Sequence, residues 1–184
     1  MKVSTLAGAI MAVSLATLST ASVAKDQGHG VITFKGAIID APCSIAQESQ
    51  YQTIDMDQIA NAELKNGGKS RLTPFKIELR GCDLGALKSA TATFTGSPAA
   101  NPELLAIKGS ATGASLAIAD HTGALIKLGS ESPAQSLSDG DTSLLFNAYL
   151  QGDMVAGKNG NPDAAAEITP GSFETFANFT LAYQ

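Results

Sequence analysis

The sequence predicts an all-β domain built as an antiparallel β-sandwich. Apolar and polar residues alternate at period two through most of the chain, which is typical of half-buried strands. The alternating runs are short, and Gly, Asp, Asn, Ser and Pro separate them at fairly even spacing. Small side chains are abundant, with 18 Gly and no Trp. Many short strands divided by turn residues favour two packed antiparallel sheets in one domain.

The N-terminus has the pattern of a cleaved secretory signal. Lys2 gives a short positive region, residues 6–18 are uncharged and apolar, and residues 22–24 are small at the two positions that a signal peptidase reads. A membrane anchor is the weaker interpretation because the apolar run is too short to span a bilayer. We expect cleavage after Ala24 and export of residues 25–184, a length that suits one domain with its own core.

Composition argues against several classes of partner. The formal net charge is −5, so nothing favours nucleic acid or an anionic membrane surface. Aromatic residues make up 5% of the chain, which is a poor supply for a sugar-stacking or drug-like pocket. We therefore expect neither a nucleic-acid partner nor a small-molecule substrate.

The first half of the mature chain contains three strand candidates. Residues 31–39 are dense in β-branched side chains and follow a polar, Gly-rich start. A second candidate covers residues 51–56, and a third alternates strictly from Phe75 to Cys82. Between them, residues 57–65 suit a short helix, and the Asn-Gly-Gly sequence that follows at 66–68 indicates a turn.

The second half continues in short apolar runs. Threonine and apolar residues alternate over 91–95, and a longer run covers 144–150. Shorter strand candidates are predicted at 104–107, 115–119 and 124–128. We expect a long flexible loop at 157–163 and a helical turn at 164–167.

The last segment has the most regular pattern in the chain. One face at period two is mostly apolar and consists of Gly171, Phe173, Thr175, Ala177, Phe179, Leu181 and Tyr183. The intervening residues, from Ser172 to Gln184, are mostly polar. An ordinary terminal strand paired within the chain would explain this alternation. The other interpretation is that one edge of the strand awaits a partner from another molecule.

The only two cysteines are Cys43 and Cys82. In an exported chain an even pair favours one disulfide, and closing a loop of about 40 residues contributes roughly 4 kcal/mol in the chain-entropy model. A redox-active or metal-binding pair would need Cys-x-x-Cys spacing or histidine partners, and the sequence has neither. We predict a structural disulfide.

Residues suited to catalysis are scarce. His29 and His121 are the only histidines, and neither has a nucleophile or an orienting acid at a recognisable spacing. No nucleophile elbow, zinc-binding helix or phosphate-binding glycine loop is present. The acid pairs Asp55/Asp57 and Asp139/Asp141 fall near predicted turns, where solvated turn acids are favoured over a weak Ca²⁺ site. We expect no enzyme, no metal and no cofactor.

Four segments together resemble the chaperone–usher pilins, in particular the rod subunits of P-type pili. They are GHGVITFKG (28–36), DAPCSI (40–45), IELRGC (77–82) and GSFETFANFTLAYQ (171–184). The last is the most specific, because such pilins carry a glycine fourteen residues from the end and an aromatic residue at the penultimate position. Gly171 and Tyr183 occupy these places.

This resemblance implies an incomplete immunoglobulin-like β-sandwich that lacks its C-terminal strand and is completed by donor-strand exchange. Residues 25–36 would be the donor extension, residues 37–184 the pilin domain and residues 1–24 the signal peptide. The donor would insert Ile32, Phe34, Gly36 and Ile38 into a groove walled by Gly171, Phe173, Phe179, Leu181 and Tyr183. A glycine at position 36 suits a shallow point of such a groove, although a bulge in an ordinary first strand would also explain it.

The function that the resemblance implies is that of a major structural subunit of a fimbria, which polymerises and supports bacterial cell adhesion. The expected partners are identical or related pilin subunits, a periplasmic chaperone and an outer-membrane usher, with the fibre at the cell surface. A tip adhesin would need a second, receptor-binding domain, which this length does not provide. A minor adaptor or terminating pilin shares length and motifs and stays the alternative.

Overall fold

The computed structural model describes residues 29–157 and 163–184. The predicted signal peptide (1–24), the start of the predicted extension and most of the predicted loop at 157–163 lie outside the described residues. Contacts divide the chain into a compact unit that begins at Ile39 and a separate N-terminal unit that ends at Ile38. Within the described residues, no helix has the length and apolar character needed to cross a membrane.

The larger sheet is formed around three long strands, β2 (Thr73–Cys82), β6 (Ala114–Asp120) and β9 (Gly140–Gly152). Its order is β1-β2-β9-β6-β4, with β7 paired to β6, and every pair is antiparallel. The short members are β1 (Ser44–Ile45), β4 (Leu105–Ala106) and β7 (Leu125–Ile126). The alternation from Phe75 to Cys82 predicts β2, and the structure agrees with it. Ile77 and Leu79 are fully buried, whereas Lys76 between Phe75 and Ile77 is exposed.

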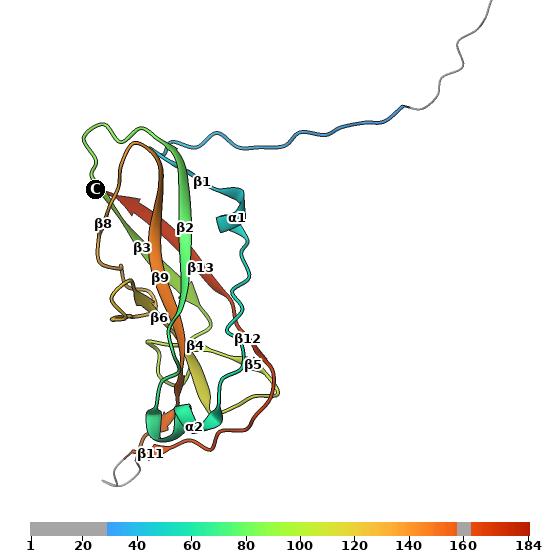
Figure 1. The fold of residues 1–184 in the computed structure, drawn as a ribbon, viewed down its shortest axis with the longest axis vertical. Helices are drawn as coiled ribbons and strands as arrows, with labels where there is room; N and C mark the ends of the chain where they lie inside the picture. The colour runs from blue at the N-terminus through green and yellow to red at the C-terminus, as the bar shows by residue number, and fades with distance from the viewer. Residues whose placement is uncertain (1–28, 158–162) are drawn as a thin grey trace, which may run out of the picture. The chain divides into compact units, whose positions relative to one another are not determined.

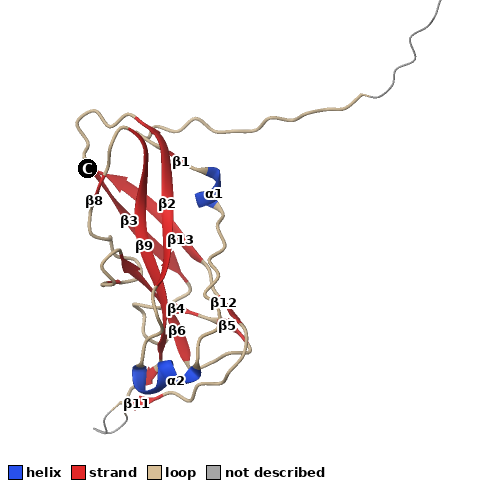
Figure 2. Ribbon diagram, in the orientation of Figure 1, coloured by secondary structure: helices blue, strands red, loops and turns tan. Residues whose placement is uncertain are grey.

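The second sheet has the order β13-β3-β8 and is also antiparallel (Figure 1). It consists of β3 (Ser89–Gly96), β8 (Gln135–Ser136) and the C-terminal β13 (Ala177–Tyr183). Two further short ladders pair β5 (Lys108–Gly109) with β12 (Phe173–Glu174), and β10 (Met154–Val155) with β11 (Ala164–Ala165). The predicted all-β fold is therefore confirmed (Figure 2).

The helices are short: α1 (Gln47–Gln50), α2 (Asn61–Leu64) and the 3-10 turn η1 (Lys65–Gly67). The last two match the predicted helix and turn, since Asn66 and Gly67 both have positive φ. Two other predictions are wrong. Residues 164–167 contain strand β11 rather than a helical turn, because Ala164 and Ala165 pair with β10. Residues 51–56 form no strand, because no neighbouring main chain of the domain pairs with them.

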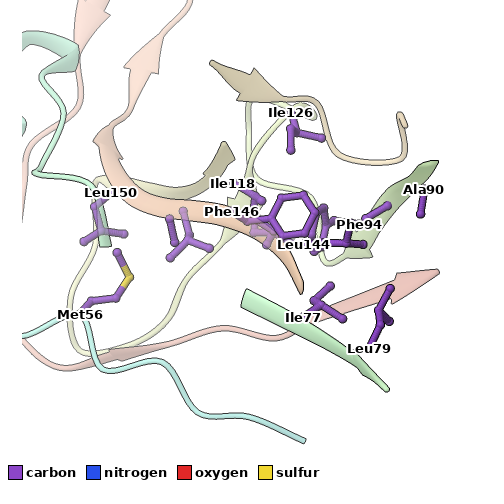
Figure 3. Packing of buried hydrophobic residues seen from close by; sticks show 14 of the residues in the cluster. Met56, Ile77, Leu79, Ala90, Phe94, Ile118, Ile126, Leu144, Phe146 and Leu150 are labelled. Atoms are coloured by element: carbon purple, nitrogen blue, oxygen red, sulfur yellow. The ribbon is translucent and has the colours of Figure 1, made fainter. Parts of the chain in front are cut away.

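The core lies between the two sheets and is filled by their inward residues (Figure 3). Phe94 from β3 contacts Phe146 from β9 edge to face, with ring centroids 5.0 Å apart. Phe75 from β2 joins them at 5.6 Å from Phe146 and 6.2 Å from Phe94. Such aromatic contacts stabilise the domain beyond the free energy gained by burying apolar surface, and they pack β3 of one sheet against β2 and β9 of the other.

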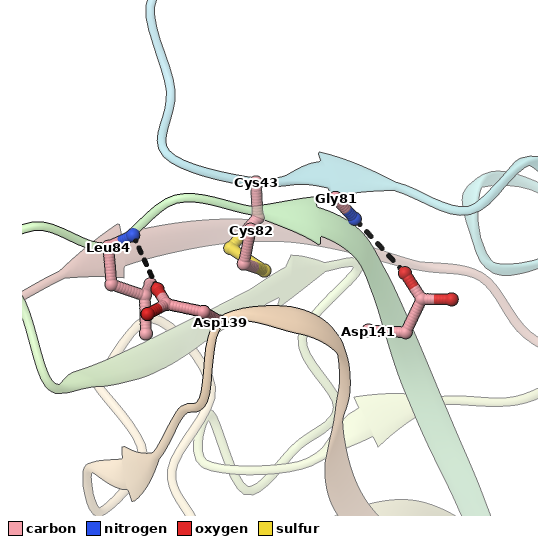
Figure 4. The surroundings of a disulfide bond; sticks show 6 residues. All are labelled: Cys43, Gly81, Cys82, Leu84, Asp139 and Asp141. Atoms are coloured by element: carbon pink, nitrogen blue, oxygen red, sulfur yellow. Dashed lines mark hydrogen bonds between the residues drawn. A yellow bond between two sulfur atoms is a disulfide. The ribbon is translucent and has the colours of Figure 1, made fainter.

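Cys43 and Cys82 form the predicted disulfide, which joins the segment before β1 to the end of β2 (Figure 4). The end of β2 is irregular, and two acids satisfy main-chain amides there: Asp141 near the start of β9 and Asp139 just before that strand. Asp141 Oδ1 accepts a hydrogen bond from the Gly81 amide at 3.1 Å, and Asp139 Oδ1 accepts one from the Leu84 amide at 3.0 Å. The two carboxylates thus accept hydrogen bonds from main-chain amides that the bulge leaves unpaired.

Candidate functional site

An open groove of about 950 Å³ runs between two rims of the domain. The first rim is the segment Ser49–Asp57, and the second is Gly171–Phe179. The floor is apolar and comes from four strands of the two sheets, through Phe75, Ile77, Phe94, Leu116, Ile118 and Ala148. A groove of this shape and lining suits an extended, apolar peptide.

The first rim begins at the end of α1, and from residue 51 onward it has no helix or strand assigned and no main-chain partner in the described part of the chain. Among the described residues, the amides and carbonyls of 51–59 make no hydrogen bond to another main chain. Gln52 is tied by its side chain, which donates to the Lys76 carbonyl at 3.2 Å. When the groove is filled, these main-chain groups are shielded from water and need new hydrogen-bond partners. A buried amide or carbonyl without a hydrogen bond destabilises the folded state.

The second rim is an edge strand. β13 pairs with β3 on one side only, from Ala177 opposite Gly96 to Tyr183 opposite Ala90. The rim changes partner at residues 175–176, since β12 pairs with β5 and β13 with β3. A side chain at position 96 would clash with the Phe176 carbonyl, so Gly96 permits this change of partner. The single strand predicted over 171–184 is therefore two strands.

The five predicted wall residues fall into two groups. Gly171, Phe173 and Phe179 line the groove, whereas Leu181 and Tyr183 pack half-buried against the core beyond its end. Burial raises the pKa of the Tyr183 phenol above its usual value of 10.0. The apolar face of the terminal strand thus serves partly as a groove wall and partly as core.

Gly171 has a packing role that the sequence does not reveal. A side chain at this position would clash with the Ser110 hydroxyl and the Ala111 amide. The close approach lets the amides of Ser110 and Ala111 both donate to the Ser172 carbonyl at 3.0 Å, while the Ser172 amide donates to Ser110 Oγ at 3.0 Å. These bonds fix the position at which the second rim enters the groove.

The predicted donor residues lie in a segment with no helix or strand assigned, 29–39. Ile32 is 79% exposed, Phe34 is 88% exposed and Ile38 is fully exposed. No atom lies within 4 Å of the position that a side chain on Gly36 would occupy. Val31 and Ile39, at the alternate positions, are exposed as well, so the segment carries five large exposed apolar side chains, and Ile32, Phe34 and Ile38 are the three that share one face.

The first rim is the part of the site that the sequence did not predict. Its residues 51–56 have the composition of a strand, and only the structure shows that they border a groove. Asp57 forms an exposed ion pair with Arg71 at 3.2 Å, and Asp55 Oδ1 accepts from the Asp57 amide at 2.9 Å. The described residues contain no cluster of three potential metal ligands. The site therefore offers apolar surface and free main-chain groups rather than reactive side chains.

An incomplete sandwich with an open apolar groove, bordered by a rim without main-chain partners and by a strand edge that is unpaired, defines a class of proteins that can accept a strand. Within this class, the chain belongs to the fimbrial protein family, whose model matches residues 32–184. It is 52% identical to the fimbria A protein of Serratia marcescens over 91% of each chain. It is 34% identical to the Pap fimbrial major pilin protein of Escherichia coli over 98% of each chain.

Solved structures agree with this assignment. A crystal structure of the P pilus rod subunit superposes with a TM-score of 0.63 at 32% identity, covering 78% of this chain and all of that one. A structure of a chaperone–usher pilus superposes with a TM-score of 0.69 at 33% identity, covering 86% and 98%. The chain is thus a major structural pilin of a chaperone–usher fimbria, an extracellular surface protein and not an enzyme.

Proposed function

We propose that this pilin polymerises by donor-strand exchange, with part of residues 31–39 of one subunit filling the groove of the next and the part nearer Cys43 beginning that subunit's own domain, the handover lying near residues 36–39. The observation that carries the proposal is complementarity within one chain. The domain has an apolar groove bordered by unpaired main chain, and the N-terminal segment exposes apolar side chains at period two. An added strand would bury those side chains and pair both rims.

The dimensions of the two partners match. From Ile32 to Ile38 an extended chain covers about 20 Å, and the rim from Gly171 to Phe179 covers about 26 Å. The four predicted donor residues therefore fit within the length of the groove. Burying a fully exposed Ile or Phe side chain contributes about 1.5–3 kcal/mol each, so three of them provide a substantial gross driving force.

The unfilled groove supports the rest of the assembly scheme. A subunit with exposed apolar surface and an unpaired main-chain edge on each rim is prone to aggregation. We infer that a periplasmic chaperone covers the groove first, using the C-terminal rim as its binding strand, and that an outer-membrane usher exports the growing fibre. In this scheme residues 1–24 are the signal peptide, 25–36 the donor extension and 37–184 the pilin domain.

The test uses the refolded mature chain, residues 25–184, and its ability to form SDS-resistant multimers. Deleting residues 25–36 should abolish multimers while the domain still folds. Gly36→Asn should abolish or strongly slow them, because an inward side chain would meet the floor of the groove. Ala37→Asn places the same side chain on the opposite face and is the matched control. Normal multimers from the deletion variant would overturn the proposal.

A further inference from the structure

The outward face of the donor segment has no role in the scheme above. When Ile32, Phe34, Gly36 and Ile38 point into the groove, the alternate residues point to solvent. Lys35 lies at the centre of this outward face and is exposed. It forms no ion pair with another described residue. Once the strand is inserted, the outward residues of the adjacent rims lie beside it on the same face.

Geometry limits the position of Lys35 to two choices. Every strand pair in the described domain is antiparallel, so we take the inserted strand as antiparallel to the second rim. The inward donors must face inward rim residues within the groove, which ends at Gly171 and Phe179. One register sets Ile32 opposite Phe179, and the other shifts the donor by two residues toward Gly171.

Both registers bring Lys35 to the same place. In the first it lies opposite Phe176, and in the second opposite Glu174, with the other residue diagonal to it. Directly opposite side chains on one face of a sheet are about 5 Å apart, and diagonal ones lie within reach of a long side chain. The conclusion therefore does not depend on which register forms.

Glu174 and Phe176 are available for such a contact. Phe176 is 66% exposed, although it is a large apolar side chain in the middle of a groove rim. Glu174 is exposed and forms no ion pair with another described residue. The facing rim adds Tyr51, which is also exposed, and the carboxylates of Asp55 and Asp57, the second of which pairs with Arg71. The mouth of the groove is thus acidic and aromatic.

We propose that Glu174 and Phe176 form an outer recognition site for Lys35 of the neighbouring subunit, in an inference that rests on the proposed strand exchange. The carboxylate attracts the ammonium group, and the aromatic ring covers the apolar stem of the lysine. The inward residues provide the driving force, while this outer pair selects a donor with a basic residue between its second and third inward positions. The site discriminates between donor strands of equal apolar character.

The experiment compares charge variants of the refolded mature chain in the multimer assay. Lys35→Glu and Glu174→Lys should each slow multimer formation about two- to fivefold at low ionic strength, and the double variant should recover most of the rate. Glu63→Lys, an exposed position on α2 outside the groove, makes the same charge change and is the control for Glu174→Lys. Phe176→Ala should slow assembly even at about 0.5 M salt, where charge effects are screened.

The outcomes separate the two proposals. If wild-type chain forms multimers and the deletion of residues 25–36 does not, strand exchange stands. In that case a Glu174→Lys rate equal to that of Glu63→Lys, or a double variant no faster than the single ones, overturns the outer recognition site alone. If the wild-type chain forms no multimers, or the deletion variant still does, both proposals fail.

Discussion

Two segments near opposite ends of the sequence, 31–39 and 171–184, have related patterns of apolar residues and reach opposite outcomes. Residues 171–184 have one mostly apolar face at period two, and residues 31–39 place Ile32, Phe34 and Ile38 on one face, with Val31 and Ile39 on the other. The C-terminal segment pairs with β5 and β3, and its Phe179 packs half-buried against the core. The N-terminal segment has no strand assigned and exposes its apolar face. Alternation thus specifies which residues share a face, but not whether a partner lies in the same chain.

The disulfide lies close to the boundary between the exposed N-terminal segment and the compact domain. It ties Cys43, four residues after the start of the compact unit, to the end of β2. Residues on one side of it are exposed, and those on the other lead into β1 and the first rim of the groove. The crosslink therefore fixes the domain end of the predicted donor segment.

Removing this crosslink should have the largest effect on the domain. A Cys43→Ala/Cys82→Ala variant should lose about 4 kcal/mol of unfolding free energy, because the unfolded chain regains the freedom of a loop of about 40 residues. Urea unfolding of the mature subunit measures the loss, with the reduced wild-type chain as control. A loss below about 1 kcal/mol would show that the disulfide does not stabilise the start of the domain.

A pair of phenylalanine substitutions compares the two segments directly. Phe179→Ala should lower the unfolding free energy of the subunit by about 2 kcal/mol, because a half-buried ring leaves the core. Phe34→Ala should leave that free energy unchanged, since Phe34 is 88% exposed, and should instead shorten the lifetime of multimers. Urea unfolding and the dissociation of multimers in warm SDS separate the two effects. Equal destabilisation of the subunit by both variants would refute the contrast.

Much of the fold follows from local pattern, because several strands are long and have one buried face. Alternation from Phe75 to Cys82 predicts β2, and the threonine alternation predicts β3. The Asn-Gly-Gly sequence predicts the turn at Asn66, where the main chain adopts positive φ. Two cysteines in an exported chain predict the disulfide, since no other pairing exists.

The parts that the sequence did not predict depend on contacts between distant segments. Residues 51–56 resemble a strand, yet their partner is absent from the chain's own sheets. The break at residues 175–176 reflects a change of neighbour from β5 to β3. Gln135 provides a third case: its side-chain amide donates to the Leu145 carbonyl at 3.0 Å and accepts from the Leu145 amide at 2.9 Å. Nothing local to Gln135 indicates this link between the two sheets.

The smallest predicted effect concerns the far end of the C-terminal strand, where the segment is core rather than groove. Tyr183 packs half-buried against the core, and burial raises the pKa of its phenol above 10.0. Above pH 10 the unfolded chain therefore loses this proton more readily than the folded one, so the unfolding free energy falls as pH rises. The contribution is fully present below about pH 9 and is lost as pH rises through the folded pKa.

Urea unfolding of wild type and Tyr183→Phe between about pH 8 and 11 isolates this effect, because the other titrating groups are common to both chains. The wild-type midpoint should fall more steeply than that of Tyr183→Phe, and Tyr51→Phe, which removes an exposed phenol, is the matched control. Parallel curves for all three chains would mean that the end of β13 opens to water in the free subunit. The whole apolar face of the terminal strand would then resemble the N-terminal segment, with both awaiting a partner.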